Sequence, residues 1–411
     1  MVDVLVATSA ALTTIALGVF SLRRIVLVGA VWSRSRAEQG SSAELPSVTL
    51  LVAARNEAET IEATLAALEK LDYPSGRLFI VLIDDASVDH TRSHLERWAK
   101  DRPLTAVLAL PERRGKSAAL KAGMSAAPAA DLIAVCDADL RPRPQSLRIL
   151  AAAFRDESVG AAVPFLSPEN ALQSGVASYA AVESWLHQLV TSAGKNRLGL
   201  SPAANGGTLY RRSALDEIGG FPQVYSGEDV WIATALTRAG WRIRFLREAV
   251  IDNTVVQSWK DYWQQHLRWS RNLFSASAAR AGASEHAVNI LQRIELWMQS
   301  AGYADRLAMV GALVFAAVGR IPLWIPLLYG LVIAVQLVTA VIMAGAGSRI
   351  FRFLAWSGVF YAVDVAATVT SVVLHILRRP RSWNRTARNR PELESISRAN
   401  PADLAVDARA E

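Results

Sequence analysis

Apolar and polar positions alternate in blocks along residues 45–250 of this 411-residue chain. Five short runs are apolar throughout and predict strands, at 47–54, 78–84, 104–109, 132–136 and 159–163. Four intervening runs with apolar residues at helical spacing predict helices, at 57–70, 89–100, 115–127 and 144–155. Strands that are apolar throughout are typical of a parallel sheet covered on both faces. The pattern therefore predicts an α/β domain with a parallel sheet between two layers of helices.

A long apolar run precedes this domain at residues 4–22 and is long enough to cross a bilayer. A cleavable signal peptide would have a basic residue before its apolar run, and none is present here. Arg23 and Arg24 instead follow the run directly. Basic residues favour the cytoplasmic side of a membrane. The run therefore predicts an uncleaved anchor that leaves the following domain in the cytoplasm.

The last third of the chain is also largely apolar, in residues 307–345 and 350–377. Arg320 interrupts the first of these runs and leaves two alternatives open. If 307–319 crosses the membrane, three spans follow the domain and the arginine-rich tail ends outside. If that segment lies in the membrane interface, two spans follow and the tail stays inside, which the distribution of basic residues favours.

Residues 287–300 combine spaced apolar positions with a tryptophan and flanking charges. This pattern predicts either an amphipathic helix on the membrane face or an ordinary surface helix packed on the domain. The chain then divides into five parts: an N-terminal anchor with its basic flank (1–44), the α/β domain (45–275), an amphipathic interfacial segment (276–305), transmembrane helices (306–378) and a basic, polar tail (379–411).

The composition supports a membrane component, because 52% of the residues are hydrophobic and the mean hydropathy is +0.21. The formal net charge of +7 would suit nucleic acid, but the arginines concentrate beside the apolar runs, where they act as cytoplasmic flanks. We therefore expect membrane lipid, and no nucleic acid, as a partner. The single cysteine, Cys136, excludes an internal disulfide, and we expect it to pack as a small apolar residue.

Polar residues follow the predicted strands where these end: "ARNE" (54–57) after the first, "DDAS" (84–87) after the second and "DAD" (137–139) after the fourth. Ligands of α/β sheets bind at the carboxyl ends of the strands. The two aspartates of "DAD" would repel each other there unless a cation joined them, and carboxylates suit a hard divalent ion such as Mg²⁺ or Mn²⁺. The "GKS" at 115–117 lacks the upstream glycine of a P-loop, which argues against ATP hydrolysis.

Two further motifs, "GED" (227–229) and "QQHLRW" (264–269), follow "DDAS" and "DAD" in order. Together the four motifs resemble those of the membrane-embedded family 2 glycosyltransferases, the group that contains cellulose, hyaluronan, chitin and poly-N-acetylglucosamine synthases. The resemblance covers residues 45–275. It implies a cytoplasmic GT-A (Rossmann-like) domain with N-terminal and C-terminal transmembrane helices, in a multi-pass protein of the inner or plasma membrane of the cell.

On the donor side, the resemblance implies a set of substrate-binding residues: Arg55, Glu57, Asp84, Asp85, Lys116 and Asp137. Asp85 would hydrogen-bond the uracil of a UDP-sugar with support from Asp84, and "ARNE" would line the nucleoside pocket. Lys116 would approach the uridine or a phosphate. Asp137 would face the ribose or diphosphate, and Asp139, together with Asp137, would ligate Mg²⁺ or Mn²⁺.

On the acceptor side, the resemblance implies that Asp229 is the general base and that Glu228 lies beside it. "NGGTLYRR" (205–212) would form the strand that precedes this base, and "SWNRTAR" (382–388) loosely resembles the W-x-T-R tail element of hyaluronan-type synthases. Three residues of the Q-x-x-R-W pattern would cover the diphosphate and the acceptor end: Gln265, Arg268 and Trp269. One base without a second nucleophile suits a single, inverting displacement.

Structural explanations of the same residues stay open. Asp229 begins a helical run, where an acid also interacts favourably with the helix dipole. Trp269 lies near Trp259 and Trp263, and all three could be interfacial aromatics. Two histidines are expected to be structural or exposed rather than catalytic: His187 and His266.

The resemblance thus implies an enzyme that transfers a sugar from a UDP-sugar to a growing β-linked polysaccharide. The alternative is the transfer of one sugar to a lipid, because glycolipid synthases carry the same Q-x-x-R-W pattern. A glycosyltransferase fold without activity, serving as a membrane scaffold, would be expected to lose the D-x-D motif or the base, and neither is lost. The glycan or lipid acceptor is therefore the question that the sequence leaves open.

Overall fold

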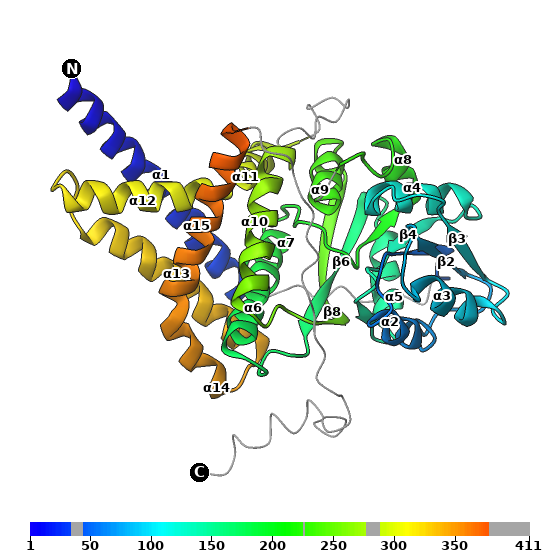
Figure 1. The fold of residues 1–411 in the computed structure, drawn as a ribbon. Coiled ribbons are helices and arrows are strands. Elements are labelled where there is room, and N and C mark those ends of the chain that lie inside the picture. The colour runs from blue at the N-terminus through cyan, green and yellow to red at the C-terminus, as the bar shows by residue number, and fades with distance from the viewer. Residues whose placement is uncertain (34–43, 225–226, 277–287, 378–411) are drawn as a thin grey trace, which may run out of the picture.

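The computed structural model describes residues 1–33, 44–224, 227–276 and 288–377, without the side chains of 272–276 and 352. An α/β domain lies on one side and a group of long helices on the other, with α6 (Gly175–Trp185) and α10 (Trp259–Ala276) between them (Figure 1). Four expectations lie outside the described residues: the basic flank at 34–36, the segment 277–287, the tail at 379–411 and its motif at 382–388.

The described part of the domain contains one eight-stranded sheet in the order β3-β2-β1-β4-β7-β6-β8-β5. The strands are β1 Val48–Ala54, β2 Leu78–Asp84, β3 Thr105–Ala109, β4 Leu132–Val135, β5 Arg141–Pro142, β6 Val159–Pro168, β7 Leu209–Arg211 and β8 Arg242–Asn253. β1 pairs parallel with β2 and β4, and β2 pairs parallel with β3. β7 is antiparallel to both β4 and β6, so β6 runs in the direction of β4. β8 is parallel to β6, and β5 is antiparallel to β8.

All five predicted strands are present and run in one direction, but the sheet is mixed and not parallel throughout. The expectation of an uninterrupted parallel sheet is wrong because β7 lies antiparallel between β4 and β6. With three residues, β7 is too short for a periodic pattern. β8 alternates buried Ile243 and Phe245 with the more accessible Arg242 and Arg244, which is the pattern of a half-buried strand rather than a continuous apolar run.

Helices cover both faces of the sheet (Figure 1). On one face lie α2 (Ile61–Leu68), α3 (Thr91–Ala99) and α5 (Ser146–Ala152), and on the other α4 (Lys116–Ala126), α8 (Arg212–Glu217) and α9 (Glu228–Arg238). Successive strand residues point to opposite faces. Leu50 and Val52 of β1 therefore enter the core under α2, α3 and α5, whereas Leu51 enters the core under α4 and α9. The four predicted helices are confirmed, with a short 3₁₀ turn, η1 (Ala153–Arg155), after α5.

The core under α4 and α9 continues into a third layer. After α6 the chain forms the π-helix η2 (Leu186–Ser192) and then α7 (Ala193–Arg197). α13 (Trp324–Ala344) packs on this layer, because its Leu337 and Val341 belong to the same apolar cluster as Val182 of α6 and Leu189 of η2. The helix predicted to cross the membrane is thus joined directly to the core of the domain.

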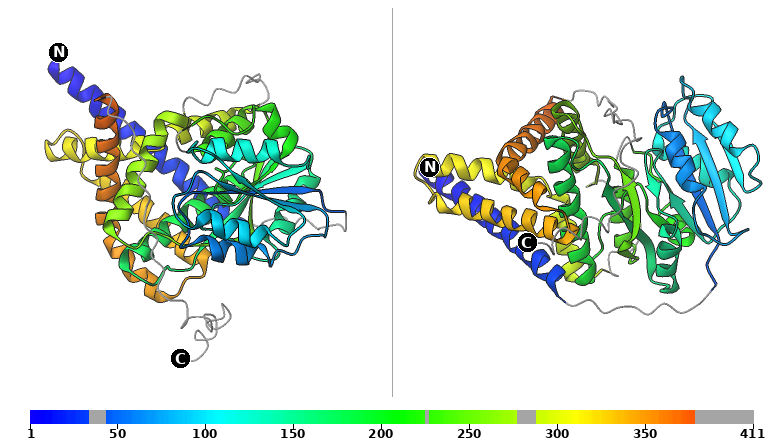
Figure 2. Two further views of the ribbon diagram at one scale, coloured as in Figure 1. Left: turned by 45° about the vertical axis from the view of Figure 1, so that its right-hand side comes forward. Right: turned by 90° about the horizontal axis from the view of Figure 1, so that it is seen from below.

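In the described part of the chain, three helices are long and apolar enough to cross a membrane, judged by length and composition. They are α1 (Val2–Trp32), α13, and the helical stretch Ser348–Ile376 that comprises α14 (Ser348–Phe351), η4 (Arg352–Trp356) and α15 (Ser357–Ile376). Two of them follow the domain. α12 (Ala304–Ala317) has 14 residues, too few for a span. This corresponds to the alternative with two later spans. Figure 2 shows α1, α12, α13 and α15 gathered on the side of the molecule away from β1, β2 and β3.

Arg23 and Arg24 lie inside α1, not at its end, and both form ion pairs. Arg23 makes a bidentate pair with Glu295 of α11 (Ile290–Ser300), with N···O distances of 2.9 and 2.6 Å. Arg24 pairs with Asp305 of α12 at 2.7 Å and donates to Gln336 of α13. The arginines that the sequence predicts as membrane flanks thus also bind the later helices to α1.

Candidate active site

The loops that follow β1 and β2 are joined by hydrogen bonds at the carboxyl edge of the sheet. The backbone N–H of Asn56 donates to Ser87 Oγ (3.0 Å), and the N–H of Val88 donates to Asn56 Oδ1 (2.9 Å). The N–H of Glu57 donates to Thr91 Oγ1 (2.7 Å). Asn56 and Ala86 have positive φ, at 53° and 54°. "ARNE" and "DDAS" therefore form one structural unit, which places Arg55 and Glu57 beside the aspartates of the second strand end.

Asp84 and Asp85 are both buried at this edge. Asp84 accepts from the N–H of Ser87 in its own loop, at 3.3 Å to each carboxylate oxygen. Asp85 accepts from the N–H groups of Arg114 (2.6 Å) and Gly115 (2.9 Å). Because α4 begins at the next residue, Asp85 ties the start of α4, with Lys116, to the end of β2.

The "DAD" motif follows β4, and its two acids are more accessible than the alanine between them. Ala138 between them is buried in the core, and its carbonyl accepts from Thr64 Oγ1 at 2.8 Å. Asp137 and Asp139 are half-buried. The loop before β7 lies directly against Asp137, whose N–H donates to the carbonyl of Gly206 at 3.1 Å. A Cβ on Gly206 would overlap Asp137 Oδ2 and lie 2.5 Å from Cγ, so this approach requires glycine.

Lys116 joins Asp137 of "DAD" to Glu228 of "GED". Its Nζ lies 2.7 Å from Asp137 Oδ1 and 2.5 Å from Glu228 Oε1. The side chain of Glu228 is only 12% exposed. Burial alone would raise the pKa of Glu228, but the Lys116 ammonium holds it below its usual value. Burial opposes the charge of Lys116 too, yet the surrounding carboxylates raise its pKa well above the usual range.

Asp229 follows Glu228 in the first turn of α9. Gly227 precedes them with φ +77°, a left-handed conformation that glycine adopts at little cost. Asp229 Oδ1 accepts from the N–H of Val230 at 2.8 Å. Burial and the neighbouring Glu228 carboxylate raise the pKa of Asp229 to about 7. The two adjacent acids thus differ in character, since Glu228 stays ionised and Asp229 titrates near neutrality.

The Q-x-x-R-W residues lie on α10, where positions three and four apart share a face. Gln265 is buried, and Arg268 and Trp269 are partly buried. Burial lowers the pKa of Arg268, and the charges of Asp137, Glu228 and Asp229 oppose that change, so the guanidinium lies within electrostatic reach of all three acids. The ring of Trp269 lies 5.3 Å from that of His266 on the same helix.

The residues available to a divalent ion are the two acids of "DAD". Their donor atoms are all oxygen, as Mg²⁺ and Mn²⁺ prefer. Within the described part of the chain, no cluster of three His, Cys, Asp or Glu side chains is arranged to hold a metal. Mg²⁺ commonly takes one or two carboxylates from a protein and completes its shell with substrate phosphate and water.

The structure brings together five of the twelve residues that the sequence singled out: Lys116, Asp137, Glu228, Asp229 and Arg268. Arg55, Glu57, Asp84 and Asp85 lie in the two adjoining loops, and Gln265 and Trp269 lie within one turn of Arg268 on α10. Cys136 is buried, as expected. Gly206 was missed as a site residue, although its "NGG" marks a turn. His266 was expected to be structural or exposed and is buried against two carboxylates.

Comparisons with known proteins concern the family and the fold of the chain. The model of the glycosyltransferase-like family 2 matches residues 46–272, more than half of the chain. An N-acetylglucosaminyltransferase of Mesorhizobium japonicum is 29% identical over 327 residues, which are 76% of this chain and 75% of that protein. A probable glycosyltransferase of Bacillus subtilis is 30% identical over 235 residues, 56% of this chain and 55% of that protein.

A beta-monoglucosyldiacylglycerol synthase of Nostoc is 30% identical over 261 residues, 62% of this chain and 55% of that protein. The chain therefore spans about half the length of the Bacillus and Nostoc relatives. A solved structure of a mannosyltransferase from Pyrobaculum calidifontis, in complex with GDP-Man and Mn²⁺, superimposes with a TM-score of 0.63 and 21% identity over 91% of this chain and all of that one. This likeness supports the GT-A-like fold.

Proposed function

The chain belongs to the glycosyltransferase-like family 2, an inverting group, and we propose that it transfers a hexosyl or N-acetylhexosaminyl group from a UDP-sugar to a growing β-linked polysaccharide. The observation that carries the proposal is the double contact of Lys116 with Asp137 and Glu228. It unites the motif assigned to the donor with the motif assigned to the acceptor in one site, at the edge of the sheet where α/β folds bind ligands.

In the proposed reaction, an acceptor hydroxyl oxygen forms a bond to the anomeric carbon while the bond from that carbon to the diphosphate breaks. The hydroxyl proton passes to the carboxylate of Asp229, the general base, whose pKa near 7 suits this task. Glu228, kept ionised by Lys116, helps to keep the pKa of Asp229 high. Attack opposite the leaving group converts an α-linked donor into a β-linked product.

On the donor side, we assign the nucleoside pocket to the joined loops of "ARNE" and "DDAS". Asp85 keeps acceptor positions besides those used by Arg114 and Gly115, so it can still accept from the uracil N–H. Arg55 Nη1 is buried, and no acceptor in the described part of the chain bonds to it, which supports a role in binding a substrate anion. The nucleotide itself requires a test, because the mannosyltransferase with the similar fold was solved with GDP-Man.

We assign a divalent ion to Asp139 and Asp137. When bound, Mg²⁺ or Mn²⁺ neutralises charge on the departing diphosphate. The chain itself supplies two further cations around that position, Lys116 and Arg268, both within electrostatic reach of Asp137. Arg268, Gln265 and Trp269 would then cover the diphosphate and the acceptor end.

The competing acceptor is a membrane lipid, which would receive a single sugar. The similarity to a beta-monoglucosyldiacylglycerol synthase favours this alternative, and so do the few helices available to enclose a glycan path. The similarity to an N-acetylglucosaminyltransferase over three-quarters of both chains favours a glycan. Both acceptors place the reacting hydroxyl beside Asp229 and Trp269, so the product decides between them.

We further propose that the protein is a multi-pass protein of the cell membrane with its catalytic domain in the cytoplasm. α11 supports this arrangement, because it turns a polar face inward and an apolar face outward. Glu295 is buried against Arg23 and Lys195, whereas the exposed residues on the other side are mostly apolar. They are Ile290, Leu291, Ile294 and Trp297, with one charged residue, Arg293, among them. Such a helix suits the interface of a bilayer.

Product analysis tests the proposed acceptor. Purified protein with Mn²⁺ and a panel of labelled UDP-sugars and GDP-mannose should yield a long, alkali-stable polymer from one UDP-sugar. Trp269→Ala should slow elongation more than donor hydrolysis, because the indole is the aromatic surface under the terminal sugar, and Trp98→Ala on α3 serves as the control. If the product partitions entirely into organic solvent as a mono- or disaccharide lipid, the acceptor is a lipid and the polysaccharide proposal is wrong.

The base is tested with Asp229→Asn. Transfer should fall about 10²-fold or more, because the acceptor proton loses its destination, while nucleotide binding measured by calorimetry is kept. In the wild type, turnover should decline as the pH falls below about 7, since Asp229 acts as a carboxylate. Glu62→Gln, in the first turn of α2, controls for loss of an acid at a helix N-terminus. Loss of nucleotide affinity in Asp229→Asn would make it a donor ligand instead.

The D-x-D motif is tested with two variants. Asp139→Asn should abolish transfer and its dependence on Mn²⁺ concentration while the protein stays folded and in the membrane. Gly206→Ala should also lower transfer, because the added Cβ displaces the carboxylate of Asp137, whereas Gly29→Ala in α1 meets no atom within 4 Å and should be neutral. Undiminished wild-type transfer in excess chelator would refute the role of a divalent ion.

The orientation is tested by cysteine labelling. Cys136 is buried, so the wild type should give little background with a membrane-impermeant maleimide. Ser33→Cys, just after α1, should be labelled only from the cytoplasmic side, and Val2→Cys, at the other end of α1, only from outside. Labelling in the reverse pattern would place the catalytic domain outside the cytoplasm.

A further inference from the structure

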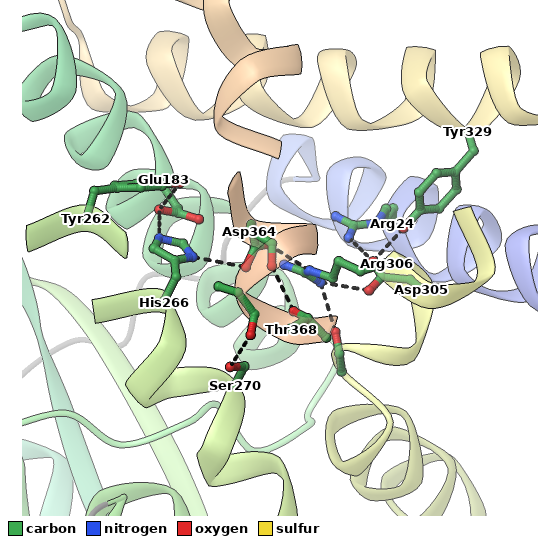
Figure 3. Close-up of polar contacts among 12 residues, drawn as sticks. Arg24, Glu183, Tyr262, His266, Ser270, Asp305, Arg306, Tyr329, Asp364 and Thr368 are labelled. Carbon is green, nitrogen blue, oxygen red and sulfur yellow. Dashed lines mark hydrogen bonds and ion pairs between the residues drawn. The ribbon is translucent and has the colours of Figure 1, made fainter. Parts of the chain in front are cut away.

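His266 on α10 is buried between two carboxylates from different helices (Figure 3). Its Nδ1 lies 3.0 Å from Asp364 Oδ1 of α15, and its Nε2 lies 3.2 Å from Glu183 Oε2 of α6. A neutral imidazole has one N–H donor and one acceptor nitrogen, whereas an imidazolium has two donors. Both ring nitrogens face carboxylate oxygens, so both can donate only when the ring is charged.

The bridge continues from Asp364 into the membrane helices. Arg306 of α12 donates to Asp364 Oδ2 at 2.8 Å and to Asp305 Oδ1 at 2.7 Å. Asp305 also accepts from Arg24 of α1 at 2.7 Å and from Tyr329 of α13 at 2.5 Å. Figure 3 shows these side chains as a continuous chain of contacts. With a charged His266 the series holds three cations and three anions and is electrically balanced.

The other contacts of α10 show which of its faces meets α15. Tyr262, one turn before His266, lies edge-on to Phe360 of α15, with ring centroids 5.1 Å apart. Ser270, one turn after His266, donates to the carbonyl of Ala367 at 3.4 Å. Tyr262, His266 and Ser270 are therefore one stripe at i, i+4 and i+8, and Arg268 lies on the opposite side of α10. Trp269 borders the stripe, since its ring lies 5.3 Å from that of His266.

We propose that His266 is a positioning residue of the transferase, whose bridge from Glu183 to Asp364 holds α10 so that Arg268 faces the acids of the active site. The proposal rests on the function assigned above to the Q-x-x-R-W residues. Because the second end of the bridge is a predicted membrane span, the position of the catalytic helix depends on the packing of α15, α12 and α1. The bilayer helices then act on sugar transfer through a defined contact as well as anchoring the domain.

The charge of His266 provides a signature that loss of packing alone would not produce. Burial opposes the charge, but Glu183 and Asp364 raise the pKa of His266 to about 9. The ionisable groups around it are Glu183 and Tyr179 of α6, Asp364 of α15, Arg306 of α12, and Tyr262 of α10 itself. A raised pKa in the folded state means that the stabilisation is complete below the unfolded value of about 6.5 and is lost as the pH rises through about 9.

The experiment combines His266→Gln with Arg268→Ala in the full-length protein in lipid nanodiscs. His266→Gln should lower turnover on the order of 10²-fold, because small displacements of a catalytic group cost about that much. If His266 acts through Arg268, the double variant should be no more than a few-fold slower than Arg268→Ala alone. The wild-type unfolding temperature should fall between about pH 6.5 and 9, and wild-type turnover should fall as the pH rises through about 9. Neither change should occur in His266→Gln.

The matched control is His187→Gln, which removes the histidine four residues after Glu183 and should keep wild-type turnover and the alkaline decline. Three results would each overturn the proposal. His266→Gln could turn over as fast as the wild type, the losses of the two single variants could multiply in the double variant, or the alkaline decline could survive in His266→Gln. If His266→Gln does not fold, Glu183→Gln tests the same bridge from α6. If the wild type transfers no sugar at all, the proposed function fails, while the unfolding temperature between about pH 6.5 and 9 still tests the bridge.

Discussion

The site depends on the compensation of negative charge at one edge of the sheet. Asp137, Glu228 and Asp229 come from two separate elements, and acids this close repel one another unless cations lie among them. Lys116 meets this requirement by direct contact with Asp137 and Glu228, and Arg268 contributes a second positive charge. The starts of α4 and α9 and the face of α10 are therefore held around one point. The same balance leaves Asp229 as the acid with the raised pKa, which suits it to accept a proton.

α10 links this site to the membrane helices because its two faces have different partners. One face carries Arg268 toward the acids, and the other carries Tyr262, His266 and Ser270 against α6 and α15. Buried ions are costly unless they are paired and hydrogen-bonded. The series from Glu183 to Arg24 meets that condition through alternating charges, and it therefore specifies how α1, α12 and α15 pack beside the domain.

Several features of the fold could be predicted because they depend on local patterns. The run that ends in "DAD" predicts a buried strand with acids at its end, and β4 with the half-buried Asp137 and Asp139 confirms it. β7 could not be predicted as an antiparallel insertion, since its three residues take their direction from the strands on either side. The membrane runs were found from length and apolarity alone, whereas the pairing of Arg23 and Arg24 with α11 and α12 was not.

The sequence by itself determined the strand ends that carry acids, the helices that carry the motifs and the segments apolar enough for a bilayer. These properties follow from neighbours within a few residues, where side-chain period and chain length decide the outcome. Only the tertiary structure decided that Lys116 lies between Asp137 and Glu228, that Gly206 lies against Asp137, and that His266 meets Asp364. These contacts join residues far apart in the chain, so they depend on how the sheet, α9, α10 and α15 pack together, which no local pattern encodes.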